Sequence, residues 1–520
     1  MNRNGFYLCR WPPACILIAL IILLLLSACS DVFEESTPVL PSPAIGTPAP
    51  PVQPTIEDEQ STATATAVPV TREPTPTLVP TTTLTVTATL AATDTSVQTV
   101  TAGPLPPTTR DLLFIADGSL KLWRQRQRQV DVLLASTAAV DSEEERTLQQ
   151  ALVGDVAGYS VSEDGRTAVA ARLTQRETII ETLEGTEAMV TLDDQRYELV
   201  WINMDNGESR VLAGDVPNLD AFTLSPDGRM LAYSAIVDVA RPETTAQLFL
   251  LDIGSGEMPP ALAACTGRCF RIVWHPENNL VVWGDAQALW LYNVAATRPE
   301  SLLANRTDTP EETALYSPIA WAANSRYLLL WKSHFEGGSR AVFDVPTGQV
   351  IDVPDSFVYV DPFPAEMVWM PDDRLYVLRS QDEGQLRPRA ELWRVSLDSG
   401  QLVLEESRQL SDQPLYATAP RYLLDGRFAY ALVSDTPVDG SGLYILTALA
   451  ENETPERVNA ILPASSAPDI QWSPDGSGAI VAQEGAVFYA PAGDDFLYNV
   501  QSILGQLAYA FTWLPERTSS

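Results

Sequence analysis

From Leu112 onward, short apolar runs alternate with polar turns in one recurring order. A first apolar strand ends in a turn with an acidic residue, and a second apolar strand and a third strand with an aromatic side chain follow. The clearest copies are residues 222–229 (Phe-Thr-Leu-Ser-Pro-Asp-Gly-Arg) and residues 470–476 (Ile-Gln-Trp-Ser-Pro-Asp-Gly). Short apolar runs bounded by such turns are typical of β-strands. The pattern therefore predicts an all-β domain built from repeats.

Eight copies of this turn can be aligned, each three residues after a large apolar side chain. The acidic or amide residues at the shared position are Asp164, Asp227, Glu277, Asn324, Asp372, Asp425, Asp475 and Glu516. Successive copies lie 41 to 63 residues apart, which is typical of the four-stranded blades of a β-propeller. Eight first strands predict eight blades, and seven is the alternative if one degenerate copy is not a blade.

A second motif follows the third strand of several repeats and pairs an acidic residue with a glycine. It occurs as Asp205-Asn206-Gly207-Glu208 and around Asp252, Asp344 and Asp398. Such turns predict a hairpin to a fourth, outer strand. Together the two motifs resemble the WD40-like repeats of the TolB-type propeller family, including bacterial lipoproteins, whose signature is a Trp-Ser-Pro-Asp-Gly turn. The resemblance covers about residues 112–515, and only 225–228 and 473–476 keep Ser-Pro-Asp-Gly intact.

The two ends of the repeat region complement each other. Residues 112–116 and 120–123 have the pattern of second and third strands without a first strand, and residues 511–515 form a first strand with nothing after it. We expect the N- and C-terminal strands to share one blade, which closes the ring and removes exposed sheet edges.

The N-terminus has the pattern of a secretory signal peptide. Arg3 and Arg10 precede an apolar run over residues 15–26, which is followed by Ser27-Ala28-Cys29. This end resembles a bacterial lipobox, which implies acylation of Cys29 after removal of residues 1–28. An uncleaved anchor is the alternative, but a dozen apolar residues reach about 18 Å against roughly 30 Å of hydrocarbon. The sequence thus predicts a lipid-anchored, extracytoplasmic protein of the cell envelope.

Residues 29–110 are rich in Thr and Pro and poor in large apolar side chains. Such a segment cannot offset its ordering entropy and predicts a disordered, semi-extended tether. Its threonines are possible O-glycosylation sites, with an unmodified spacer as the alternative. The propeller domain then occupies residues 111–520.

Charge excludes one class of partner. The chain has 67 acidic and 33 basic residues, for a formal net charge of -34. Such a field repels phosphate backbones and anionic lipid surfaces, so we expect no nucleic-acid partner. Contact with the membrane is expected through the lipid at Cys29 only.

The repeated residues are predicted to be structural. Carboxylates in the turns are expected to accept local backbone N–H groups, with calcium binding as the alternative; these residues are Asp164, Asp227, Asp372, Asp425 and Asp475. Cys265 and Cys269 predict a disulfide in an exported protein. Zinc would need further ligands, and His275 and His334 are the only histidines. We predict no metal and no cofactor.

No catalytic motif is present: Gly-x-Ser-x-Gly, His-Glu-x-x-His and a phosphate-binding glycine loop are all absent. The long connections 136–158, 173–196, 305–318 and 354–366 are expected on one face of the ring, where binding residues concentrate. The candidate aromatic residues there are Tyr316, Phe357, Tyr359 and Phe363. The alternative is that these acidic loops only maintain solubility.

Three function classes remain from the sequence. A non-enzymatic binding or scaffold module with a protein or glycan partner is favoured, because a fold alone does not define chemistry and no catalytic residue can be named. A hydrolase or lyase acting on a glycan or small molecule in the channel requires converging carboxylates or a metal. A structural envelope protein requires a broad interface without a pocket.

Overall fold

The computed structural model describes residues 99–101 and 110–516, except for the gaps 125–128, 140–146, 148–149, 183–188, 238–245, 256–258, 278, 307–312, 359–365, 383–384, 437, 460–461, 463–467, 484 and 495. The predicted signal peptide, the predicted lipidation residue Cys29 and most of the predicted tether lie outside these residues. Within the described residues, no helix has the length and apolarity that a membrane span requires.

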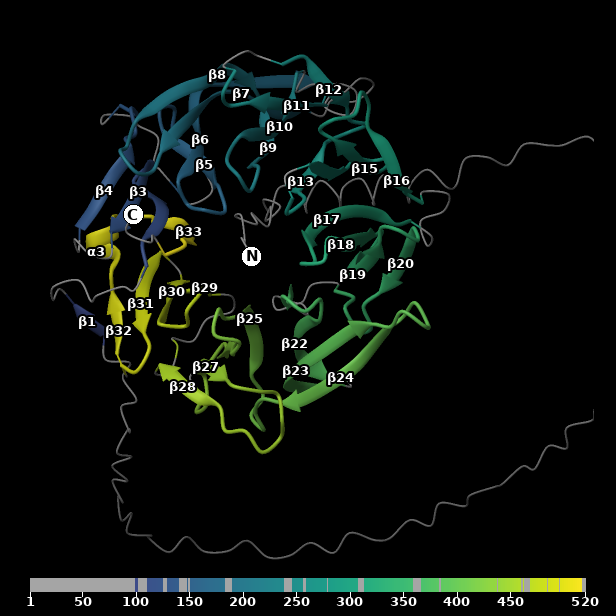
Figure 1. Ribbon diagram of the computed structural model, residues 1–520. Coiled ribbons are helices and arrows are strands. Elements are labelled where there is room, and N and C mark those ends of the chain that lie inside the picture. The colour runs from purple at the N-terminus through teal and green to yellow at the C-terminus, as the bar shows by residue number, and fades with distance from the viewer. Residues whose placement is uncertain are drawn as a thin grey trace, which may run out of the picture. The chain divides into compact units, whose positions relative to one another are not determined.

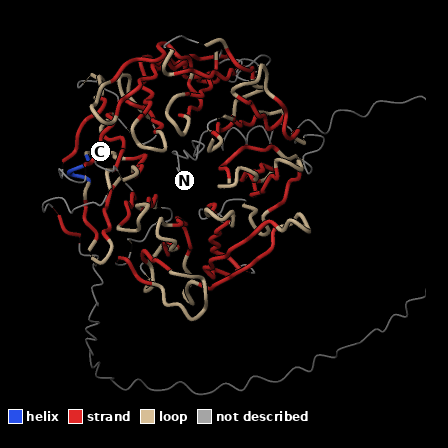
Figure 2. Tube along the Cα trace, in the orientation of Figure 1, coloured by secondary structure: helices blue, strands red, loops and turns tan. Residues whose placement is uncertain are grey.

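Eight sheets stand around a central axis (Figure 1), each with four antiparallel strands, and one of them carries a fifth strand in parallel. Nearly all of the described regular structure is strand, with one short helix, α3 (Gln501–Leu504) (Figure 2). The predicted eight-bladed β-propeller is confirmed, and the seven-bladed alternative is wrong. Each repeat forms one blade because it can bury its strands only against neighbouring repeats.

Blades 2 to 8 each consist of four consecutive strands, numbered from the axis outward. Blades 2 to 4 contain β5 (Val156–Val161), β6 (Thr167–Thr182), β7 (Met189–Asn203) and β8 (Ser209–Pro217); β9 (Leu219–Leu224), β10 (Met230–Ile236), β11 (Ala246–Asp252) and β12 (Ala261–Ala264); and β13 (Phe270–Trp274), β14 (Leu280–Gly284), β15 (Ala288–Asn293) and β16 (Glu300–Ala304). Blades 5 and 6 contain β17 (Leu315–Trp321), β18 (Tyr327–His334), β19 (Gly337–Asp344) and β20 (Gln349–Asp352); and β21 (Glu366–Trp369), β22 (Leu375–Asp382), β23 (Gln385–Val395) and β24 (Leu402–Gln409). Blades 7 and 8 contain β25 (Tyr416–Tyr422), β26 (Phe428–Val433), β27 (Gly442–Leu446) and β28 (Glu456–Asn459); and β29 (Asp469–Trp472), β30 (Gly478–Gln483), β31 (Ala486–Pro491) and β32 (Leu497–Asn499).

Blade 1 is assembled from both ends of the described chain. Its strands, from the axis outward, are β33 (Tyr509–Trp513), β2 (Leu112–Ala116), β3 (Ser119–Arg124) and β4 (Gln129–Leu134). β33 and β2 pair antiparallel with Leu112 opposite Trp513. The predicted closure is therefore confirmed. Within the segment predicted as a tether, β1 (Thr99–Thr101) pairs in parallel with β32 of blade 8.

Alternate residues of one strand pack against opposite neighbouring blades. In β2, Leu113 and Ile115 belong to the core shared with blade 2, whereas Leu112 and Phe114 belong to the core shared with blade 8. Successive side chains of a strand point to opposite faces of the sheet. Both faces of each blade are covered, and this explains why β2 is apolar at every position and fully buried.

Tryptophan side chains link the first strands of adjacent blades. Four indole Nε1–H groups donate to a carbonyl oxygen in the first strand of the preceding blade: Trp274 to Thr223 (3.1 Å), Trp369 to Ala320 (3.2 Å), Trp472 to Ala419 (3.1 Å) and Trp513 to Gln471 (2.9 Å). Each indole thus fills the space between two blades and satisfies a buried polar group. The last of these bonds joins blade 1 to blade 8 across the closure.

Candidate binding surface

The turns between first and second strands carry the predicted structural carboxylates. Each of these carboxylates accepts the backbone N–H of the residue two positions later; the pairs are Asp164 with Arg166 (2.9 Å), Asp227 with Arg229 (3.1 Å), Asp372 with Arg374 (3.3 Å), Asp425 with Arg427 (3.2 Å) and Asp475 with Ser477 (3.1 Å). This is the local bonding that favours Asp in turns. The following Gly228 and Gly476 have φ of 71° and 72°, a region in which glycine carries no steric cost.

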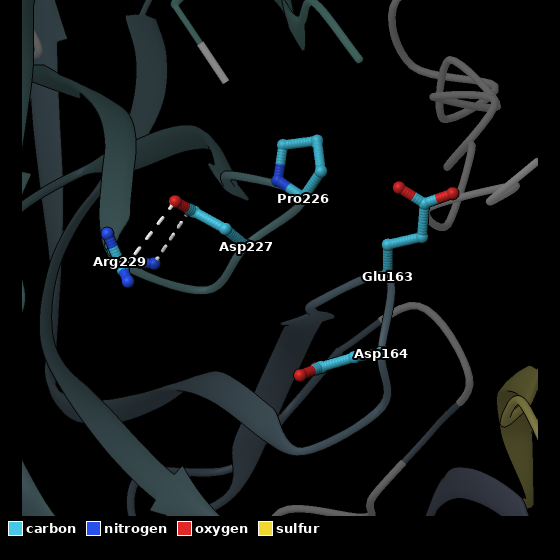
Figure 3. A pocket seen from close by; sticks show the side chains of 5 residues that line it. All are labelled: Glu163, Asp164, Pro226, Asp227 and Arg229. Atoms are coloured by element: carbon cyan, nitrogen blue, oxygen red, sulfur yellow. Dashed lines mark hydrogen bonds and ion pairs between the residues drawn. The ribbon is translucent and has the colours of Figure 1, made fainter. Parts of the chain in front are cut away.

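A shallow hollow lies between two of these turns. It has a volume of about 430 Å3 and is lined by Glu163, Asp164, Pro226, Asp227 and Arg229 (Figure 3). Asp164 accepts a hydrogen bond from the Ser162 hydroxyl (2.6 Å), and Asp227 accepts one from the Ser225 hydroxyl (2.7 Å). The two aspartates are therefore bonded within their own turns, and the hollow belongs to the structural framework of the ring.

Asp475 also ties the closing blade to blade 8. Its carboxylate lies 3.3 Å from Nε of Arg110, which immediately precedes blade 1 and is 7% exposed. Burial by itself raises the pKa of Asp475, but hydrogen bonds from Ser477 and Ser473 and the charge of Arg110 outweigh it. The net effect lowers the pKa from 3.8 to about 2. The ionised form of Asp475 is thus favoured in the folded protein.

We expect Asp475→Asn to remove an acid-sensitive contribution to stability. A carboxyl group with a depressed folded-state pKa stabilises the protein above its unfolded-state pKa, and this contribution is lost as the pH falls through the folded-state value. The wild type should therefore lose about 1 to 2 kcal/mol more than the variant between about pH 4 and pH 2. Urea unfolding at several pH values measures this difference. Asn324 occupies the same turn position in blade 5 and accepts the same N–H bond (2.8 Å), so Asn fits the turn. The prediction would be contradicted if the free energies of unfolding of the wild type and the variant fell by the same amount between about pH 4 and pH 2.

Cysteine and histidine side chains were the remaining candidates for chemistry. Cys265 and Cys269 are joined by a disulfide in the connection between β12 and β13. His275 is buried, and its Nδ1 accepts the N–H of Glu277 (3.2 Å). Within the part of the chain that the structure describes, no three His, Cys, Asp or Glu side chains come together as a metal site.

The predicted aromatic binding residues have different environments. Phe357 is 44% exposed, in the connection that follows β20. Tyr316 is only 4% exposed and packs in the core with Leu330 and Phe343, so its assignment to an exposed face is wrong. The reason is that Tyr316 belongs to the first strand β17, whose faces are covered by adjacent blades. Tyr359 and Phe363 lie outside the described residues.

The predicted connection 173–196 is largely a hairpin. β6 and β7 remain paired from Thr167 opposite Asn203 to Thr182 opposite Met189, with one register shift. The expectation of a long loop is therefore wrong for most of this segment. The acidic residues Glu143, Glu144 and Glu145 of the preceding long connection lie outside the described residues.

Blade 5 presents an exposed aromatic cluster, which we call the blade 5 aromatic patch: His334, Phe335 and Phe357. Phe335 lies in the turn between β18 and β19 and is 65% exposed. The rings of His334 and Phe357 are 5.6 Å apart. Sequence reasoning missed Phe335, although an aromatic residue followed by Glu-Gly-Gly was a visible signal of an exposed hairpin turn.

Close backbone contact holds the patch together. Gly338 and Val358 exchange two backbone hydrogen bonds, of 3.1 and 2.8 Å. A Cβ atom on Gly337 would lie 2.2 Å from the carbonyl oxygen of Val358 and 3.2 Å from the ring of Phe357. Glycine at this position therefore lets the segment with Phe357 approach the hairpin with Phe335.

Side chains of two blades fix the backbone beside Phe357. The hydroxyl of Ser356, which is 3% exposed, accepts the N–H of Arg340 (2.9 Å) and donates to the carbonyl of Val353 (2.8 Å). Arg379 of blade 6 donates to the carbonyls of Asp355 (2.7 Å) and Pro354 (2.6 Å). Phe357 thus projects from a backbone that is bonded on both sides.

His334 contributes a neutral ring to the patch at neutral pH. Its Nε2 lies 3.1 Å from the Ser339 hydroxyl. Burial and the nearby charge of Lys332 lower the pKa of His334 below its usual value, and a hydrogen bond of the ring to the backbone of Thr313 and the charge of Asp352 oppose this only in part. The patch is therefore apolar and aromatic rather than cationic.

Comparisons with known proteins found similarity to solved structures only, at low sequence identity. No family model and no curated protein matches the sequence. Dipeptidyl peptidase 4 of Porphyromonas gingivalis is 13% identical with a TM-score of 0.45, and the match covers 76% of this chain and 62% of that one. A proposed TolB of Agrobacterium tumefaciens is 12% identical with a TM-score of 0.30, covering 58% and 90%. The propeller domain of Myceliophteria thermophila Cps50 (Swd1) is 13% identical with a TM-score of 0.36, covering 62% and 91%.

This chain thus spans less than two thirds of the length of the Porphyromonas peptidase. At these identities a likeness concerns the fold alone. The eight sheets described above define the class: the protein is an eight-bladed β-propeller of four-stranded antiparallel blades.

Proposed function

We propose that this protein is a non-enzymatic binding module of the cell envelope. In this proposal a lipid at Cys29 anchors it to a membrane, residues 29–110 hold it at a distance, and the blade 5 aromatic patch contacts a protein partner. The other two function classes, a hydrolase or lyase and a structural envelope protein, are predictions from the sequence alone.

The single observation that carries the proposal is the exposure of Phe335 and Phe357 on a fixed backbone. Large aromatic side chains dominate binding energy when a partner covers them, because each buries a large apolar area with few rotatable bonds. The backbone bonds between Gly338 and Val358 and the hydrogen bond of the Ser356 hydroxyl hold the backbone beside Phe357 in place. Less conformational entropy is then lost on association.

We expect the double substitution Phe335→Ala and Phe357→Ala to weaken partner binding at least about tenfold, since central aromatic contacts contribute about 2 kcal/mol or more each. The purified full chain would be crosslinked to native membranes, and the captured partner would then be titrated against both forms. The matched control is Leu424→Ala, because Leu424 is 71% exposed but lies in a first-to-second-strand turn at the opposite end of the blades.

Folding of both variants would be checked by thermal unfolding, where exposed substitutions are expected to change stability by less than about 0.5 kcal/mol. Equal affinity of the double variant and the Leu424→Ala control would contradict the assignment of the patch. Capture of a glycan instead of a protein would replace the proposed partner class.

A further inference from the structure

The first described strand of the chain is attached to blade 8, although the chain enters the ring at blade 1. β1 pairs in parallel with β32, the outermost of the four antiparallel strands of blade 8 (Figure 1). The register places Thr99 opposite Leu497 and Thr101 opposite Asn499. The chain then continues to blade 1, whose strand β2 begins at Leu112. We call the pairing of β1 with β32 the strap.

The strap is held more weakly than the next strand along the chain. β1 pairs over three residues with β32, and its other edge has no partner strand among the described residues. β2 pairs over five residues with β3 and also pairs with β33 on its other edge, and all of its side chains are buried. A segment with little pairing and little apolar burial opens at a smaller free-energy cost. β1 therefore separates from the ring at a lower load than β2.

Arg110 provides a second attachment between the strap and β2. Its side chain is buried, and its Nε lies 3.3 Å from the carboxylate of Asp475 in the turn between β29 and β30 of blade 8. Separating a buried charge from its partner is costly. The chain is thus fixed to blade 8 at Arg110 whether or not β1 is paired with β32.

A pull on the N-terminal end of the chain reaches these attachments in a fixed order. It acts first on Thr99, where β1 begins, and reaches Arg110 and β2 only after β1 has left β32. The weakest attachment is therefore also the first one to carry the load. The proposed function creates such a load, because a lipid at Cys29 holds one end of the chain and a partner on the blade 5 aromatic patch holds the ring.

We propose that the strap is a mechanical release: tension separates β1 from β32 and lengthens the tether, while the ring stays closed at Arg110 and β2. Separation frees residues 99–109, which add a reach of up to about 40 Å at about 3.6 Å per extended residue. No covalent bond changes, and β1 stays linked to blade 8 by a short segment, so it pairs again when the load falls. This inference rests on the proposed function, since only a chain that is anchored and bound to a partner carries a load.

The test stretches single molecules of the purified full chain between two handles in optical tweezers. One handle is attached to the thiol of Cys29 and the other to Leu397→Cys, because Leu397 is 74% exposed in the turn between β23 and β24. Cys9→Ser and Cys15→Ser remove the other thiols outside the disulfide. We expect one reversible extension of up to about 40 Å at low force, followed by unfolding of the ring at higher force.

Thr99→Pro combined with Val100→Pro should abolish the early extension and leave the unfolding force of the ring unchanged. Successive backbone N–H groups of a strand point to opposite sides, so one of the two prolines removes the donor that faces β32. The matched control is Ser96→Pro combined with Val97→Pro, which places the same two residues before β1. This control should keep the early extension.

Absence of the early extension in the chain with an intact β1, or its persistence in the Thr99→Pro and Val100→Pro variant, would overturn the proposal. A lower unfolding force of the ring in that variant would make the strap part of the ring closure and would overturn it as well. The measurement uses neither lipid nor partner. Failure of capture through Phe335 and Phe357 would therefore contradict the binding function without changing the early extension.

Discussion

Truncation of the chain after Leu504 is expected to abolish cooperative folding of the propeller. The truncation removes β33, the innermost strand of blade 1, with its buried side chains Phe511 and Trp513. β2 then has an unpaired edge, and the apolar core between blades 1 and 8 is opened to water. Removing one large buried aromatic side chain costs about 3 to 5 kcal/mol. Two such losses together with the strand pairing approach a typical total stability of 5 to 15 kcal/mol.

Circular dichroism and tryptophan fluorescence during heating would follow the transition, and gel filtration would detect expansion or association. The matched control ends after Glu516 and keeps β33 complete. A cooperative transition of the shorter chain at the temperature of the control would show that blade 1 does not need its C-terminal strand.

Trp472→Ala is expected to destabilise the protein by about 3 to 5 kcal/mol, the usual cost of emptying a buried tryptophan site. Trp472 is 4% exposed and packs in the core with Leu423 and Ala431 of blade 7. Its indole also donates to the carbonyl of Ala419. The substitution leaves a cavity between two blades and a carbonyl without its donor. Denaturant unfolding measures the loss.

A matched pair of phenylalanine substitutions separates the hydrogen bond from the packing. Trp321 has the same position in blade 5 and is 5% exposed, but its buried Nε1 has no hydrogen-bond partner among the described residues. We expect Trp472→Phe to cost about 1 kcal/mol more than Trp321→Phe, the net contribution of a typical hydrogen bond. Equal losses of stability in the two variants would mean that the indole hydrogen bonds between blades add no stability beyond that of packing.

The repeat spacing was sufficient to predict the ring because each blade satisfies its turn with local bonds. Asp227 and Asp475 each accept an N–H from the residue two positions later. Such contacts depend on a few adjacent residues, so a short motif can specify them. The shared blade was predictable for a related reason, since a first strand at one end complements the unpaired strands at the other.

The paired extension of β6 and β7 could not be predicted in this way. Residues 174–178 read Thr-Gln-Arg-Glu-Thr and are polar at every position. A strand is recognised from its sequence when one face is apolar or both are. These residues are mostly exposed, so their pairing leaves no alternation in the sequence.

The candidate binding surface was also only partly predictable from the sequence. Phe357 could be identified because it is an aromatic residue in a long connection. Tyr316 was wrongly assigned to an exposed face because its burial depends on the adjacent blades.

The sequence by itself determined the eight blades, the closing strand and the turn bonds, because these follow from strand periodicity and from residues a few positions apart. Only the tertiary structure decided which aromatic side chains face solvent and which charges meet between blades, as Arg110 and Asp475 do. The physical reason is that burial and electrostatic interaction depend on distance in space, and the ring places side chains together that are far apart along the chain.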